Sequence, residues 1–186
     1  PTLHADVSSV DITERRPLED GRRFGDVGPY EEIVGTITFA IDPTDPRNQV
    51  ITNLDRAPTN AQGMVETTAD LMILTPADAE HGNGVALVDI ANRGRLSALG
   101  LNRGGTGQFG DGFLMKEGYT IVWVGWEFDV PADRQIRIQV PSAAGFPVGG
   151  LGFAAVLSRL DPPRSGQGLE QQADPFLLHF LLLAVE

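Results

Sequence analysis

The chain has 186 residues, a length that suits one domain with an ordinary hydrophobic core and leaves little room for a second. Its 14 lysines and arginines against 25 aspartates and glutamates give a formal net charge of −11, which favours solubility and argues against nucleic acid as a partner, because a polyanion would be repelled. The chain contains no cysteine, and this excludes disulfides, thiolate metal sites and a cysteine nucleophile.

The first third of the chain predicts an antiparallel meander. A short strand is expected over residues 7–17, and the apolar and polar alternation of residues 31–41 is typical of a half-buried antiparallel strand. Two further strands are expected over residues 50–54 and 64–74. Turns that contain proline end several of these segments, since the residue before a proline is restricted and proline donates no backbone hydrogen bond.

Two apolar runs near the middle of the chain predict the parallel part of a sheet. Residues 85–90 and 119–126 are β-branched and nearly continuous in hydrophobicity, as expected of strands that are buried on both faces. Between them, residues 96–101 and 113–117 are expected to be helical, so that the whole segment forms a βαβ unit. The glycine-rich residues 102–110 lack the spacing of a phosphate-binding motif and are expected to form a mobile surface loop.

The turn Asn92-Arg93-Gly94 directly follows the first of these two runs. Ligands of α/β sheets bind beyond the carboxyl ends of the strands, so this turn lies where a ligand would be expected. Trp126, at the end of the second run, is the corresponding candidate for the edge of a pocket, although aromatic residues in such positions are more often part of the core.

The last part of the chain changes from polar to strongly apolar. A strand is expected over residues 135–140 and a helix over residues 149–160, which Asp-Pro-Pro closes. After a polar stretch, the segment from Phe176 to Leu183 is apolar on every side, so we expect it to meet a second copy in a homo-oligomer or to belong to a larger structure. No segment reaches the roughly 20 apolar residues that span a bilayer.

Three segments together resemble the α/β-hydrolase-domain family, an esterase-like group with a β-rich segment ahead of its hydrolase sheet. They read RRPLEDGRRFGDVGPYEEIVGTITFAIDP, GNGVALVDIANRGR and GDGFLMKEGYTIVWVGWEFDVP, and GGLGFAAVLSRL further on is similar to the helix before the family's nucleophile strand. The resemblance implies an α/β fold class: a β-rich, partial α/β-hydrolase-like sheet with an amino-terminal antiparallel meander and few short helices. It covers residues 1–160, and residues 161–186 follow as a polar linker and an apolar terminal segment.

The catalytic part of the family pattern does not match. A Gly-x-Ser-x-Gly elbow exposes the nucleophile on a sharp turn, and no serine here has glycine at both flanking positions; Ser165 comes nearest. The resemblance implies that Asn92, Arg93 and Gly94 border the oxyanion hole, where backbone N–H groups would face developing negative charge. The alternative, which the missing nucleophile favours, is that Gly94 permits a turn and Arg93 pairs with a surface carboxylate.

We therefore expect the amino-terminal portion of an α/β-hydrolase-like protein, related to carboxylic ester hydrolases but not catalytic alone, with a small-molecule ester as substrate if it is active. One alternative is a non-catalytic β-rich binding or assembly domain that dimerises through its apolar carboxyl-terminal segment. Another is a minimal hydrolase that uses Ser165, His179 and Asp174. Neither a cofactor nor a metal ion is expected, because no acidic or histidine pattern has zinc or EF-hand spacing.

Overall fold

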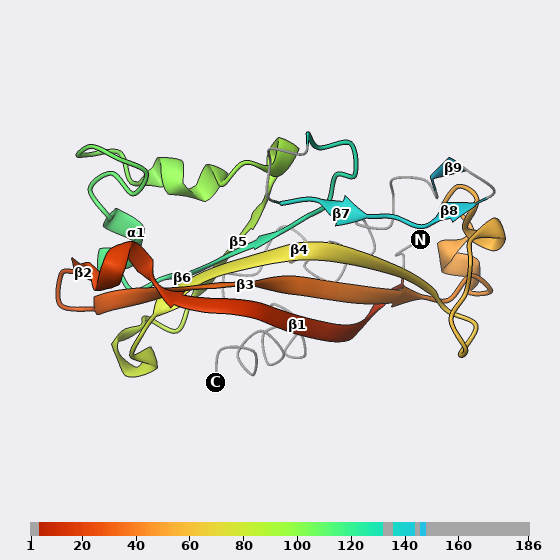
Figure 1. Ribbon diagram of the computed structural model, residues 1–186, viewed down its shortest axis with the longest axis horizontal. Helices are drawn as coiled ribbons and strands as arrows, with labels where there is room; N and C mark the ends of the chain where they lie inside the picture. Colours follow the sequence, from red (N-terminus) through yellow and green to blue (C-terminus); the bar gives the residue numbers. More distant parts are fainter. Residues whose placement is uncertain (1–3, 132–135, 144–145, 148–186) are drawn as a thin grey trace, which may run out of the picture. The chain divides into compact units, whose positions relative to one another are not determined.

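The computed structural model describes residues 4–131, 136–143 and 146–147, which form a β-rich fold with few short helices (Figure 1). The strands are β1 (Asp6–Pro17), β2 (Arg23–Phe24), β3 (Gly28–Ile41), β4 (Val65–Pro76), β5 (Ala86–Ile90), β6 (Thr120–Val124), β7 (Ile138–Gln139), β8 (Ser142–Ala143) and β9 (Phe146–Pro147). The α-helix is α1 (Phe113–Lys116), and the 3-10 helices are η1 (Leu18–Gly21), η2 (Pro46–Asn48), η3 (Leu54–Arg56), η4 (Ala79–His81), η5 (Asn92–Gly94) and η6 (Ser97–Leu101).

A mixed sheet of seven strands has the order β1-β3-β4-β6-β5, with β2 paired to β3 and β7 to β4, while β8 and β9 form a separate pair. The chain divides into two compact units, one made of residues 11–37 and 69–138 and the other of the remaining segments. The β-rich, mixed character that the sequence predicts is confirmed.

Strands β1, β3 and β4 form the meander predicted for the first third of the chain. Contacts between facing residues run in opposite numerical order: Thr13 with Val34 and Arg16 with Glu32 between β1 and β3, Pro29 with Ala77 and Thr38 with Thr68 between β3 and β4. Both pairs are therefore antiparallel. A side chain at Gly35 would collide with the carbonyl oxygen of Asp11, so glycine lets β1 lie close to β3.

Strand β6 lies between two partners of opposite orientation. It pairs antiparallel with β4, where Met72 faces Trp123, and parallel with β5, where Val88 faces Val122. All the side chains from Ile121 to Val124 are buried, as predicted for a strand covered on both faces. Strand β5 differs from the prediction because each of its residues is only half-buried; in the described part of the chain it is an edge strand with a single neighbour.

The connection from β5 to β6 consists of short helices, not of one long crossover helix. Its glycine-rich segment is fastened to the core: Phe109 is buried, and the buried Asn102 side chain accepts a hydrogen bond from the Leu114 N–H at 2.8 Å. The expectation of a mobile surface loop over residues 102–110 is therefore wrong for its two ends. The many glycines of this segment suggested a free loop, but the buried Asn102 and Phe109 attach it to the core.

Tyr30 joins the amino-terminal hairpin to the segment before β6. Its buried hydroxyl lies 3.1 Å from the Met115 carbonyl oxygen and 3.0 Å from that of Tyr119, and burial raises the pKa of this hydroxyl. Its ring meets that of Phe24 edge to face at 5.5 Å. Phe24 in turn lies against Gly112, where φ is +69° and a Cβ would stand 2.8 Å from the ring, so only glycine fits.

Of two further predicted strands, the one over residues 50–54 is wrong and the one over residues 135–140 is shorter than expected. Residues 50–54 form turns that lead into η3, with Ile51 and Leu54 buried and Val50 exposed; a spacing of three residues suits a 3-10 turn better than a strand. The strand expected over residues 135–140 is reduced to β7. The backbone N–H of Arg137 donates to the Asp70 carboxylate at 3.0 Å in this region. The helix expected over residues 149–160 and the apolar run from Phe176 to Leu183 lie outside the described residues.

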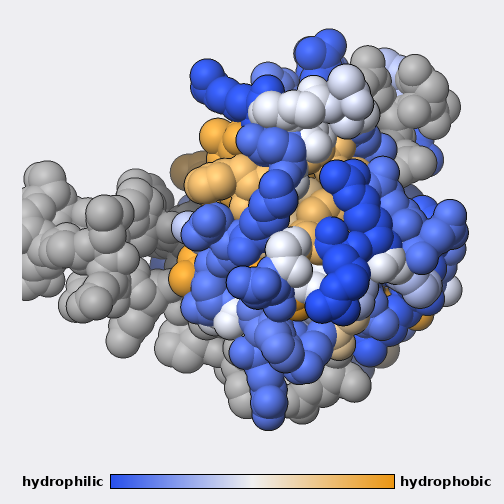
Figure 2. All heavy atoms as spheres, turned by 90° about the vertical axis from the view of Figure 1, so that its left-hand side faces the viewer, coloured by the Kyte–Doolittle hydropathy of each residue, from blue (hydrophilic) through white to orange (hydrophobic). Residues whose placement is uncertain are grey.

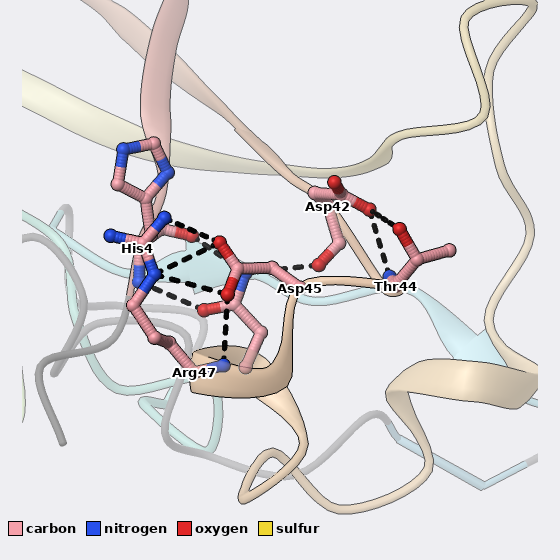
Figure 3. A network of polar contacts seen from close by, with 6 residues as sticks. His4, Asp42, Thr44, Asp45 and Arg47 are labelled. Carbon is pink, nitrogen blue, oxygen red and sulfur yellow. Dashed lines mark hydrogen bonds and ion pairs between the residues drawn. The ribbon is translucent and has the colours of Figure 1, made fainter.

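The buried Asn48 ties the start of β1 to the turn after β3. Figure 3 shows His4, Asp42, Asp45 and Arg47 of the same polar network. The Asn48 amide donates to the carbonyl oxygens of His4 and Asp42 at 2.8 and 2.9 Å, and its oxygen accepts the His4 N–H at 2.8 Å. Next to it, Asp45 caps η2 by accepting the Arg47 N–H at 2.8 Å and also binds the guanidinium of Arg47. These hydrogen bonds satisfy the polar atoms of Asn48 away from water.

We expect Tyr30→Phe to lower the free energy of unfolding by about 1–2 kcal/mol, because the carbonyl oxygens of Met115 and Tyr119 lose their buried donor. Urea denaturation measures the change. Tyr119→Phe is the control, since its hydroxyl makes no hydrogen bond within the described residues; equal losses in the two variants would contradict the role assigned to Tyr30.

The hydrogen bonds from the Arg47 guanidinium and N–H lower the pKa of Asp45 from its ordinary 3.8 to about 2. The stability that this carboxylate contributes is therefore present above pH 3.8 and is lost as the pH falls through 2. We expect Asp45→Asn to remove that acid-side decline in urea denaturation between pH 5 and 2. Asp55→Asn, in the next turn, serves as the control; parallel pH profiles for Asp45→Asn and the unmodified chain would show that Asp45 has no such role.

Candidate functional site

The predicted site residues meet at one edge of the sheet. Asn92, Arg93 and Gly94 form η5 immediately after β5, and Trp126 follows β6. Because β5 and β6 are parallel, their carboxyl ends lie side by side. The indole Nε1 of Trp126 donates to the Ala91 carbonyl oxygen at 2.9 Å, so the two strand ends are joined directly.

The turn after β5 uses two left-handed residues in succession. Arg93 has φ +53° and Gly94 has φ +69°, and the Gly94 N–H donates to the Ala91 carbonyl oxygen at 3.2 Å. Gly94 is buried, whereas Asn92 and Arg93 are exposed. A left-handed conformation costs a non-glycine residue about 1–2 kcal/mol, so Arg93 needs compensating contacts.

Carboxylates from the segment after β6 supply these contacts. The backbone N–H of Arg93 donates to Glu127 Oε2 at 2.8 Å, and its guanidinium donates to Asp129 Oδ2 at 2.7 Å and lies 3.8 Å from Glu127 Oε2. The hydrogen bond from Arg93 holds the pKa of Asp129 below its ordinary value. Arg93 therefore ties the turn after β5 to the segment after β6 through both its main chain and its side chain.

Asp89 is a second organising residue, which the sequence interpretation missed. Its Oδ2 accepts the indole N–H of Trp123 at 2.8 Å and the backbone N–H of Ala98 at 2.6 Å. One carboxylate thus links β5, β6 and the start of η6, and so fixes both ends of the Asn92–Gly94 turn. The available signal was the single acidic residue within the apolar run VALVDI; Glu127 gave no comparable signal, because its partner is distant in sequence.

The chemistry available at this site is recognition of a negatively charged oxygen. A backbone N–H and a guanidinium converge on the Glu127 carboxylate, and this combination suits anions. Among the described residues, no group of three or more histidine, aspartate or glutamate side chains could hold a metal ion. Ser165, Asp174 and His179 lie outside those residues. In the same part of the chain, no helix is long and apolar enough to cross a membrane.

Apolar side chains are exposed on the helices that connect β5 to β6. Leu101 at the end of η6 is 49% exposed, and Phe113 at the start of α1 is 48% exposed. Figure 2 views the side on which α1 lies in Figure 1, and shows apolar surface surrounded by hydrophilic residues. Neither residue takes part in the hydrogen bonds of Arg93 to Glu127 and Asp129.

Comparison with known proteins finds no matching family model, no matching curated protein and no matching solved structure.

Proposed function

We propose that this chain is the amino-terminal portion of an α/β-hydrolase-like protein related to carboxylic ester hydrolases, and that it does not catalyse ester hydrolysis alone. The observation that carries the proposal is the Arg93 N–H, which is held at the carboxyl end of a parallel strand and donates to a carboxylate oxygen at 2.8 Å. The substrate class of the proposal is a small-molecule ester.

The distance at Arg93 suits the chemistry. Attack on an ester places negative charge on its carbonyl oxygen, and fixed N–H donors about 2.7–3.1 Å away stabilise that charge. The carboxylate of Glu127 lies within this range of the Arg93 nitrogen. The left-handed conformation of Arg93, its guanidinium bond to Asp129 and the bond from the Trp126 indole to the Ala91 carbonyl oxygen hold the donor in place before any ligand arrives.

The sequence lacks the motif that would supply the nucleophile of such a site. A serine nucleophile needs a sharp strand-to-helix turn with glycines around it, and no serine of these 186 residues has that context. His81 does not lie at the described site: it precedes β5 and pairs with Asp78 at 2.9 Å, while the Arg93 turn follows β5. The length of β5, about 3.3 Å for each residue, therefore lies between His81 and the Arg93 turn.

We expect the purified 186-residue chain to leave a fluorogenic short-chain ester unhydrolysed, because its sequence has no Gly-x-Ser-x-Gly elbow to position a nucleophile. The assay compares the unmodified chain with Ser165→Ala and with buffer. Turnover by the unmodified chain that disappears in Ser165→Ala would contradict the proposal and would support the minimal hydrolase that uses Ser165, His179 and Asp174.

One observation favours a second candidate, the non-catalytic binding or assembly domain: the Arg93 N–H already has a carboxylate partner within the chain. Sedimentation of the full chain and of a chain that ends at Leu160 separates the two candidates. Our proposal predicts heterogeneous association of the full chain through its apolar segment from Phe176 to Leu183. Clean dimers that become monomers after truncation would instead support the assembly domain.

A further inference from the structure

We infer that Glu127 caps a binding site for small carboxylate anions at Arg93, and that its side chain occupies the place such an anion would take. The inference deepens the proposed function and rests on it for the idea that this N–H serves a substrate oxygen. It adds that the Arg93 N–H is blocked in this chain, because the Glu127 carboxylate already accepts its hydrogen bond. Binding of a carboxylate can be measured without any ester turnover.

The contacts of Glu127 are those of a bound anion. Its Oε2 accepts the Arg93 N–H at 2.8 Å and lies 3.8 Å from Arg93 Nε. Hydrogen bonds between a charged acceptor and a positioned donor are stronger than neutral ones. The Glu127 side chain is 17% exposed, so water weakens its bond to Arg93 less than it would at an open surface.

The approach from solvent is through Arg93. Its side chain is 57% exposed, although its guanidinium is paired with Asp129. An anion can therefore reach the guanidinium first and then replace Glu127 at the backbone N–H. A small carboxylate matches the oxygen geometry and the charge of the group that it replaces.

The strand ends do not depend on the Glu127 carboxylate alone. The Trp126 indole still donates to the Ala91 carbonyl oxygen, and the Arg93 guanidinium still donates to Asp129, when the Glu127 side chain is removed. Movement of Glu127 can therefore open the N–H while the turn keeps two of its ties to the segment after β6. Glu127 can therefore be replaced to test the cap while these two hydrogen bonds remain.

The test follows the backbone amide of Arg93 by NMR while acetate is added to the full 186-residue chain. In Glu127→Ala we expect a saturable shift of this amide, with acetate affinity at least about tenfold above that of the unmodified chain. Glu80→Ala is the matched control, since it removes one carboxylate from η4, ahead of β5, and leaves both Glu127 and Asp129 on Arg93. We expect its Arg93 amide to respond to acetate like that of the unmodified chain.

An Arg93 amide that responds to acetate no more in Glu127→Ala than in the unmodified chain would overturn the inference. If Glu127→Ala does not fold, Glu127→Leu takes its place, because leucine fills similar space and has no oxygen to accept the Arg93 N–H; absence of an acetate response there is equally decisive. Ester turnover by the chain alone, or clean dimers, would contradict the proposed function and would leave the acetate result standing. Absence of acetate binding would not alter the ester assay or the sedimentation.

Discussion

Strand β6 is paired along both edges and buried on both faces. β4 lies antiparallel on one side and β5 parallel on the other, and the side chains from Ile121 to Val124 are almost fully shielded from water. Because β5 has only β6 as a neighbour in the described part of the chain, the turn after β5 is positioned through β6. The site at Arg93 is thus a consequence of how well this one strand is held.

Carboxylate side chains supply the hydrogen bonds that hold the turn after β5 in place. Asp89 satisfies the Trp123 indole and the first turn of η6, and Glu127 and Asp129 satisfy Arg93. Part of the acidic excess of this chain therefore has defined local partners at the strand ends. The same arrangement explains how a non-glycine residue keeps a left-handed conformation: the charge-assisted hydrogen bonds of Arg93 offset its backbone strain.

The sequence predicts elements well where one local pattern decides the outcome. Alternation identifies β3 and a continuous apolar run identifies β6, because each pattern follows directly from which faces are covered. It fails where partners are distant or spacing is ambiguous. Ile51 and Leu54 are apolar but three residues apart, and the partnership of Arg93 with Glu127 joins residues that no local pattern relates. Half-burial of β5 depends on its edge position, which hydrophobicity alone does not reveal.

The strand order has a consequence for the newborn chain. β6 is synthesised after β5 yet inserts between β5 and β4, so the apolar edge of β4 from Leu71 to Leu74 must wait for its partner. Contacts between residues far apart in sequence form slowly, and an unpaired apolar edge is prone to aggregate meanwhile. The apolar segment from Leu71 to Leu74 therefore leaves the ribosome before the strand that covers its edge has been made, and this is the stage of folding at which the chain is most open to aggregation.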